Sequence, residues 1–230
     1  MGERAASKVL AGPEEAAAVG EGAPHASALK LVTASKRETI LEGMLHAVGS
    51  VGYEAASVRT VLDLAGLYRQ AFYDNFADKE NCYLEAFDFG VERLDALVVA
   101  ATSSEETWLG KLRAGLGALL EALDRDADVG RALVVEVHAA GPEALSKRAA
   151  AMKRVTDFVD SAREIPGRGE SPPPIAPEGI VAGIHAVVHA RLATGTNEGF
   201  RELLPEFMYF AVLPYFGSDA AEREMEAARA

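Results

Sequence analysis

The apolar residues of this chain recur every three to four positions over most of its length, which is the spacing of one face of an α-helix. Ile40, Met44 and Val48 show this spacing first, and it returns in the long apolar stretches after Trp108. No stretch alternates apolar and polar residues as a half-buried strand requires. The sequence therefore predicts an all-α protein.

Composition divides the chain into four segments. Residues 1–34 are rich in Ala, Gly and Glu and lack a sustained apolar stripe, so we expect a disordered arm. Residues 35–80 carry three short helical patterns, and residues 81–217 carry longer ones. We expect residues 218–230, which are strongly charged, to fray. Residues 165–179 contain five prolines and three glycines, so we predict a mobile loop there.

The net charge of −12 does not by itself favour a nucleic-acid partner, because phosphate binding needs Lys and Arg. Even residues 35–80 hold five basic side chains against seven acidic ones. A prediction of DNA binding must therefore rest on geometry.

Two further absences narrow the class of protein. No stretch of 18 or more uncharged apolar residues occurs, and no secretory signal is recognisable at the N-terminus, so we expect a cytoplasmic bacterial protein with no membrane contact. Cys82 is the only cysteine, which excludes an intrachain disulfide and a multi-cysteine zinc site. We expect its thiol to be buried or neutral.

Residues 57–80 have the spacing of a helix-turn-helix, in which the second of two short helices lies in the major groove of DNA. Ser57 is a good N-cap for the first helix, and Gly66 allows a tight exit from it. Phe72 and Phe76 would form the buried face of the second helix. The outward side chains are then Arg69, Gln70, Tyr73 and Asp74. Arginine can bind phosphate or guanine, glutamine can bond adenine, and a tyrosine hydroxyl can bind phosphate.

The segment SVRTVLDLAGLYRQAFYDNFADKENCYLEAF resembles the tetracycline-repressor (TetR) family of transcription regulators. The matching features are the Ala-Gly turn, the arginine just after it, the aromatic pair Phe72-Tyr73, Phe76 and the Asp78-Lys79-Glu80 start of the next helix. The resemblance implies that Arg69 and Gln70 contact bases. It also implies phosphate contacts from Lys36, Arg37, Ser57, Arg59, Tyr73, Asn75 and Lys79.

Three positions depart from the family pattern. Tyr68, which we still count among the DNA-contacting residues, stands where a capping serine is common, and Ala71 stands where a small hydroxyl residue is common. At least one phosphate contact is therefore expected to be missing. We expect the carboxylate of Asp74 to hold Arg69 in place; the alternatives are a bond to cytosine or repulsion of phosphate. A three-helix module that binds a protein instead of DNA is the alternative for the whole region.

The resemblance also implies that residues 81–217 hold a ligand cavity and a dimer interface. The helices of GIVAGIHAVVHARLATG and of the segment ending at Phe216 would form a four-helix bundle with their mates about a two-fold axis. The helices between Trp108 and Ala162, with part of the penultimate helix, would line an effector pocket, although most of the candidates are equally good core residues. These candidates are Trp108, Leu112, Leu116, Arg131, Val135, His138, Met152, Val155 and Phe158.

His185 and His189 are four positions apart, a spacing that can hold a metal on one helix face, with His138 as a third ligand. HAVVH lacks the glutamate of the HExxH zinc helix, so we expect dimer packing or pocket polarity instead, and no metal. An all-α metal enzyme built on these histidines is the least favoured alternative.

No Ser-His-Asp frame, phosphate loop or dinucleotide fingerprint is apparent, so we expect neither an enzyme nor a cofactor. The leading hypothesis is a homodimeric repressor that an unidentified small-molecule effector releases from a palindromic double-stranded DNA operator. The alternative is a factor of the same fold that organises DNA or binds a protein partner and has no inducer.

Overall fold

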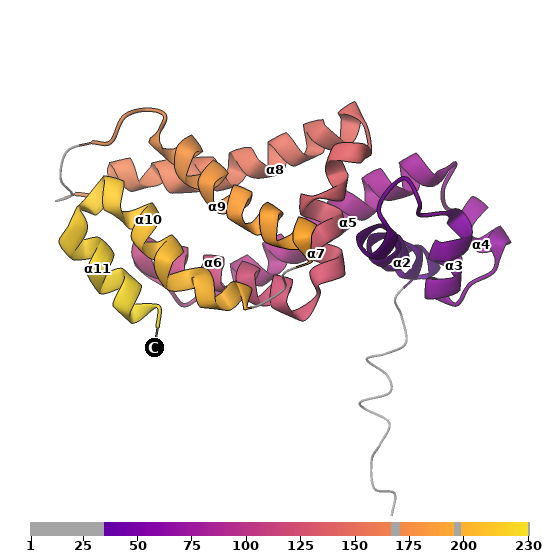
Figure 1. Cartoon of the computed structure of the whole chain (residues 1–230), viewed down its shortest axis with the longest axis horizontal. Helices are drawn as coiled ribbons and strands as arrows, with labels where there is room; N and C mark the ends of the chain where they lie inside the picture. The colour runs from indigo at the N-terminus through magenta and orange to yellow at the C-terminus, as the bar shows by residue number, and fades with distance from the viewer. Residues whose placement is uncertain (1–34, 167–170, 196–198, 230) are drawn as a thin grey trace, which may run out of the picture. The chain divides into compact units, whose positions relative to one another are not determined.

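The computed structural model describes residues 35–166, 171–195 and 199–229. All regular elements within these ranges are helical, which confirms the predicted all-α class (Figure 1). The predicted disordered arm, residues 1–34, lies outside the described residues. The elements are α2 (Lys36–Val51), α3 (Val58–Ala65), α4 (Arg69–Tyr73), α5 (Lys79–Thr102), α6 (Trp108–Arg125), α7 (Ala127–Val134), the 3-10 turn η1 (Glu136–Ala139), α8 (Pro142–Asp160), η2 (Ser161–Glu164), α9 (Ala176–Thr194), η3 (Phe200–Leu203), α10 (Leu204–Phe216) and α11 (Ser218–Ala227).

Side-chain caps set the starts of the first helices. At α2 the backbone N–H of Glu38 donates to the Ser35 hydroxyl at 3.2 Å, and the Ser35 N–H donates to the Glu38 carboxylate at 2.7 Å. This is a capping box, which satisfies two helix-start donors reciprocally. At α3 and α5 the side chains of Ser57 and Asp78 each accept one backbone N–H of the first turn.

The first hydrophobic core joins α2, α3, α4 and the first half of α5, which gather together in Figure 1. Phe72, Phe76 and Tyr83 are buried in it, and each such side chain contributes roughly 1.5–3 kcal/mol. The same core takes in Ala132 of α7 and Val137 of η1. The short N-terminal helices therefore pack against α7 and η1 in one hydrophobic core.

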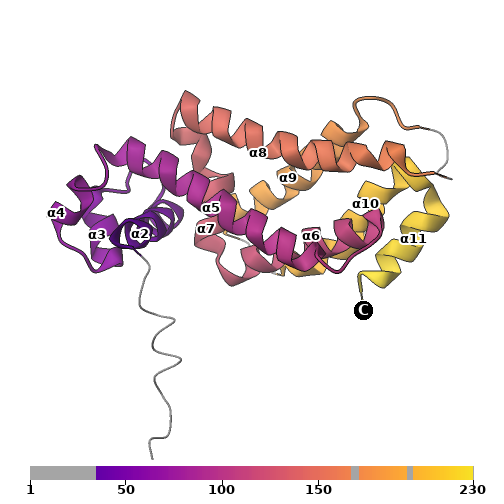
Figure 2. The ribbon, with the colours of Figure 1, turned by 180° about the vertical axis from the view of Figure 1, so that it is seen from behind.

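The second core joins α6, α8, α9, α10 and α11, and Figure 2 shows α10 and α11 side by side. Leu120, Leu192, Met208 and Tyr215 are almost completely inaccessible there. The larger part of the chain thus folds around apolar residues of its own, as the helical spacing indicates.

Residues 218–227 do not fray as predicted but form helix α11. Ala221 and Ala228 are buried, and Arg113 of α6 donates to the Glu224 carboxylate at 2.9 Å. A narrow stripe of alanines and one ion pair are therefore enough to hold a segment that is otherwise charged.

Two other boundaries differ from the predictions. The predicted loop ends at Ala176, where α9 begins, because Pro177 fits the first turn of a helix, which needs no N–H donor; residues 167–170 of that loop lie outside the described residues. Helix α7 ends at Val134 and η1 follows from Glu136, so the helical spacing after Trp108 does not produce one continuous helix over residues 129–140.

Cys82 is completely buried in the first core. Burial raises the pKa of its thiol to about 12, although Arg37 opposes this shift. The expectation of a buried or neutral thiol is confirmed.

Candidate nucleic-acid interface

Helix α4 is the second helix of the helix-turn-helix candidate. Gly66 ends α3 with a φ of 64°, a left-handed backbone conformation that residues other than glycine rarely adopt. Phe72 is buried against Phe76, with ring centroids 5.6 Å apart, so the back of α4 is fixed to the core. Arg69 and Gln70 remain exposed on the outer face, as the spacing predicts.

Two pairs of side chains stiffen the exposed face of α4. Arg69 Nη2 donates to the Tyr73 hydroxyl at 3.3 Å, and its guanidinium lies 5.4 Å from the centroid of that ring. Gln70 Nε2 donates to Asp74 Oδ1 at 2.6 Å. The prediction that Asp74 holds Arg69 is wrong. Residues five apart on a helix point about 140° away from each other, whereas residues four apart share a face.

Tyr68 precedes α4 and makes no capping hydrogen bond, as predicted. Its side chain is 89% exposed, the largest exposure among the big apolar residues described. Ala71 packs at the edge of the first core. The start of α4 therefore presents an aromatic ring where a capping hydroxyl is common.

The other predicted phosphate-contacting side chains differ in how far contacts within the protein already hold them. Lys36 is exposed at the start of α2. Arg59 faces Asp63 at 3.7 Å, a fully solvated pair that holds it weakly. Ser57 is occupied as the N-cap of α3, and Asn75 donates its amide to the carbonyl of Ala71 at 2.7 Å.

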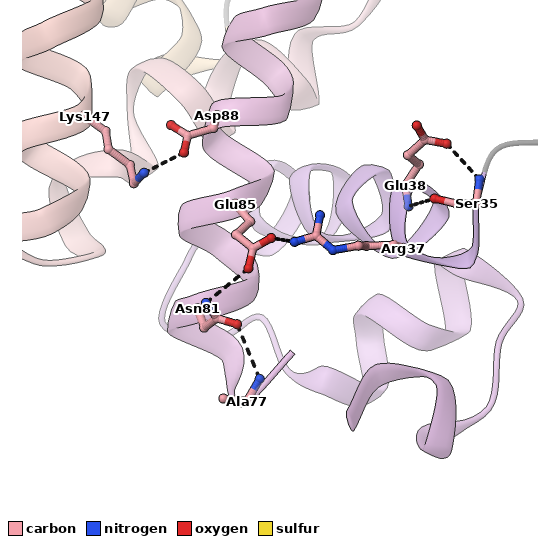
Figure 3. A network of polar contacts seen from close by, with 8 residues as sticks. All are labelled: Ser35, Arg37, Glu38, Ala77, Asn81, Glu85, Asp88 and Lys147. Carbon is pink, nitrogen blue, oxygen red and sulfur yellow. Dashed lines mark hydrogen bonds and ion pairs between the residues drawn. The ribbon is translucent and has the colours of Figure 1, made fainter. Parts of the chain in front are cut away.

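Arg37 is committed to the packing of α2 against α5 (Figure 3). It forms an ion pair with Glu85, and its guanidinium lies 5.1 Å from the centroid of the Phe76 ring. Asn81 donates to the same carboxylate at 3.3 Å and accepts the N–H of Ala77 at 3.4 Å. A DNA phosphate would have to share this guanidinium with Glu85.

Lys79, at the start of α5, is also engaged. Its Nζ donates to the carbonyl of Tyr53 at 2.8 Å and lies 4.3 Å from the centroid of that ring. The Tyr53 ring in turn meets Tyr83 edge-on, with centroids 5.0 Å apart. The ammonium thus stands at a helix N-terminus, which is itself favourable for an anion, but its position depends on Tyr53.

Tyr53 connects this surface to η1, a connection that the sequence did not predict. The Tyr53 N–H donates to Glu136 Oε2 at 2.9 Å, and Arg131 of α7 donates to Glu136 Oε1 at 3.0 Å. The hydroxyl of Tyr83 donates to the carbonyl of Ala132 at 2.7 Å. Nothing in the spacing signals these contacts, because 83 positions separate Tyr53 from Glu136.

The predicted pocket residues divide between core and surface. Trp108 stacks on Phe158 with ring centroids 5.7 Å apart, and its Nε1 donates to the Phe158 carbonyl at 3.2 Å. Arg131 is held by Glu136, and His138 is exposed. The remaining candidates belong to the second core, pack against it or lie near the surface: Leu112, Leu116, Val135, Met152 and Val155.

Two hollows are present elsewhere in the described part of the chain. One, of about 310 Å³, lies between α5, α6 and Arg201; the other, of about 340 Å³, lies between α2, α5, α6 and α7. None of the predicted pocket residues lines either hollow.

The three histidines of the weak metal hypothesis do come together. The His189 ring centroid lies 5.8 Å from that of His138 and 6.3 Å from that of His185. Within the described ranges, however, no three His, Cys, Asp or Glu side chains are grouped so that they could hold a metal ion.

No helix in the described ranges combines the length and apolar character that crossing a bilayer requires.

A short exposed helix packs on three others, and a larger helical bundle follows. This is the arrangement of a helix-turn-helix protein, and solved structures show which family of such proteins has this fold. A TetR family transcription regulator from Marinobacter aquaeolei matches 78% of this chain and 95% of its own with a TM-score of 0.62 and 21% identity. FadR from Bacillus subtilis, solved with stearoyl-CoA, matches 76% of this chain and 96% of its own with a TM-score of 0.64 and 16% identity. The chain has the fold of the TetR family regulators, which confirms the predicted resemblance.

Sequence similarity is confined to part of the chain. The HTH-type transcriptional repressor Rv1474c of Mycobacterium tuberculosis is 33% identical over 85 residues, which are 37% of this chain and 43% of the repressor. The chain thus spans less than half the length of this relative. No family model matches the chain.

Proposed function

We propose that the chain is a transcription regulator that binds a palindromic DNA operator as a homodimer and represses the genes beside it. The observation that carries this proposal is the outer face of α4, where Arg69 and Gln70 are exposed while Phe72 fixes the helix from behind. Similarity to a helix-turn-helix repressor and the TetR-family fold support it.

In this proposal α4 enters the major groove. Arg69 and Gln70 contact base edges, and their i,i+4 partners Tyr73 and Asp74 reduce the rotamer freedom that binding would otherwise remove. Tyr68 lies beside them at the groove. The phosphates are contacted by Lys36, Arg37, Ser57, Arg59, Tyr73, Asn75 and Lys79.

The dimer forms through α9 and α10. Small residues of α9 that include Ala182, Ala186 and Ala190 are exposed along one stripe, and Phe210 and Leu213 of α10 are exposed although both are large and apolar. Two copies that bury these faces about a two-fold axis form a four-helix bundle. The two α4 helices then meet successive major grooves, about 34–36 Å apart.

A small molecule releases the operator in this proposal. FadR from Bacillus subtilis was solved with stearoyl-CoA, which shows that a neighbour of this fold accommodates a small molecule. The Glu136–Tyr53–Lys79 contacts give a route by which a change in α7 or η1 reaches the DNA-facing surface. A ligand that weakens DNA binding 100-fold represents about 2.7 kcal/mol of coupling. DNA must then weaken ligand binding by the same factor.

A second candidate is a factor of the same fold that has no inducer. It is favoured by the packing of Leu112, Leu116 and Met152 into the second core, where a cavity was predicted. The two candidates share α4 and differ only in whether a small molecule changes the affinity for DNA.

The test is selection of bound sequences from random double-stranded DNA with the full chain, followed by fluorescence anisotropy and light scattering. The proposal expects an enriched inverted repeat, bound by two copies of the chain. Uniform recovery of all sequences, or a monomer on the selected DNA, would contradict it. Titration of the complex with candidate effectors then separates the inducible regulator from the factor without an inducer.

A further inference from the structure

An arginine stands among the apolar residues by which α8 faces the rest of the bundle. Ala144 and Val159 are buried near the two ends of α8, and Arg148, Met152 and Thr156 are partly buried between them, at the spacing of one helix face. Lys153 and Arg154, in contrast, lie on the exposed side. Arg148 therefore places a charge on the face of α8 that packs against the bundle.

Two histidines meet Arg148 from α9. His185 lies on the face of α9 that carries buried Val181 and Val188, and Arg148 Nη2 lies 3.4 Å from His185 Nε2. A guanidinium can only donate, so Nε2 accepts and the His185 ring is neutral. The ring centroid of His189 lies 6.3 Å from that of His185, and His138 of η1 closes the group 5.8 Å from His189.

Within the described ranges, no acidic side chain forms an ion pair with Arg148, His138, His185 or His189. The partly buried arginines Arg113, Arg131 and Arg163, in contrast, each pair with a carboxylate. The Nε of Arg148 is buried and donates to nothing in those ranges. Burial and the Arg148 charge, together with His189 and His138, lower the pKa of His185 to about 4, so the site is short of negative charge.

We infer that Arg148, His185 and His189 form a binding site for the oxyanion group, carboxylate or phosphate, of a small molecule. An oxyanion accepts from the guanidinium edge that is unpaired and from the histidine rings that surround it. His138, which is exposed, marks the side from which solvent reaches the cluster. Met152 lies one helical turn after Arg148 and packs against the second core, so the apolar remainder of a ligand would have to displace it there.

This inference names the chemical class of the effector, and to that extent it rests on the proposed function. Whether the cluster binds an oxyanion does not depend on the proposed function. A metal ion does not fit the cluster, because Arg148 would repel it. An occupant with a carboxylate or phosphate supplies the negative charge that the described side chains around Arg148 do not provide.

The test uses the full chain in chloride buffer and three probes: octanoate, octyl phosphate and uncharged octanol. Calorimetry is expected to show binding of one or both anions and much weaker binding of octanol, and the preferred anion identifies the group. Arg148→Gln is expected to weaken the binding of the anions by roughly tenfold or more, because it removes the charge-assisted hydrogen bonds. The matched control is Arg154→Gln on the same helix, whose arginine pairs with Asp95 on the surface and which should change binding by less than about twofold.

Thermal unfolding of the free variants separates a ligand-binding arginine from a structural one. Arg148→Gln is expected to unfold at or above the wild-type temperature, since it removes a buried donor without a partner. In NMR spectra the His185 ring should titrate at higher pH when octanoate is bound, because a nearby anion favours the imidazolium.

The inference is overturned if octanol binds as well as the anions, or if Arg148→Gln leaves anion affinity unchanged. It is also overturned if Arg148→Gln changes the oligomeric state, since the arginine would then serve contacts between copies. Operator binding is measured separately on the ligand-free protein. Loss of anion binding with intact operator binding removes only this inference, whereas anion binding without DNA binding removes only the proposed function.

Discussion

Glu136 accepts the backbone N–H of Tyr53 at 2.9 Å and thereby ties η1 to the turn that follows α2. The other oxygen of the same carboxylate accepts from Arg131. The carbonyl of Tyr53 accepts from Lys79, so one residue, Tyr53, links η1 to the start of α5.

Glu136→Ala should lower the free energy of unfolding by about 1–3 kcal/mol, because it leaves the Tyr53 N–H and Arg131 without their acceptor. Glu136→Gln keeps an acceptor and should lower the free energy of unfolding by less. Urea unfolding checks both, with Glu143→Ala, an exposed glutamate of α8, as the control. Equal losses for the Ala and Gln variants would argue against a hydrogen-bonding role.

Arg69→Ala and Gln70→Ala should reduce discrimination between operator and random DNA by about 1–3 kcal/mol, as the loss of a good base contact does. The free energy of unfolding should hardly change, because both side chains are exposed. Anisotropy titrations at one salt concentration give both affinities. Unchanged discrimination would remove these two residues from the base-contacting set.

Lys36→Ala and Lys79→Ala should both weaken binding to every sequence and lower the slope of log affinity against log salt by about one. They should differ in stability. Only Lys79 holds the Tyr53 carbonyl and ring, so only its variant should unfold at a lower temperature. A Lys79 variant with unchanged stability and unchanged salt dependence would contradict both roles.

Acid should destabilise the fold through His185. The pKa of His185 is lowered to about 4 by burial, Arg148, His189 and His138, whereas its ordinary value is 6.5. Between these values the unfolded chain binds a proton that the folded chain does not, so stability falls as pH drops from 6.5 towards 4. Since solvent partly screens the ring, the loss should be on the order of 1 kcal/mol.

Urea unfolding in chloride buffer at several pH values measures this effect. His185→Asn should flatten the profile over that window, whereas the control His46→Asn, which changes a surface histidine beside Asp126, should not. A wild-type profile that is already flat would show that His185 does not carry the pH dependence.

Gly49→Ala should destabilise the protein by about 1–3 kcal/mol, because overpacking forces the backbone apart. A methyl group there would lie 2.0 Å from the carbonyl oxygen of Asp128, where α2 meets α7. Gly115→Ala is the control, since its nearest neighbour is a Val98 methyl at 3.3 Å. Melting temperatures that fall equally for both would show that the α2–α7 contact tolerates displacement.

Local signals carried most of what could be predicted. The capping box at Ser35, the caps at Ser57 and Asp78 and the buried pair Phe72 and Phe76 follow from rules that act within one turn of helix. The positions of the exposed side chains of α4 follow from the same rules. The partner of Asp74 could also have been found this way, because Gln70 is four positions before it.

Contacts between distant segments could not be predicted. The Tyr53–Glu136 bond and the approach of Arg148 to His185 depend on how whole helices pack, which periodicity alone does not specify. The alanines that hold α11 were hidden by the charges around them. The predicted pocket residues show the same limit, because apolar spacing does not distinguish residues that line a cavity from residues that fill it.

Cys82 has a practical consequence. A thiolate is the form of cysteine that reacts with maleimides and other electrophiles, and this thiol is both inaccessible and held protonated. Since the sequence has no other cysteine, the native chain should remain unlabelled under conditions that modify exposed thiols. One cysteine introduced at Tyr68 would then carry a dye at the start of α4, and the two dyes of a dimer would report the spacing of its recognition helices by energy transfer.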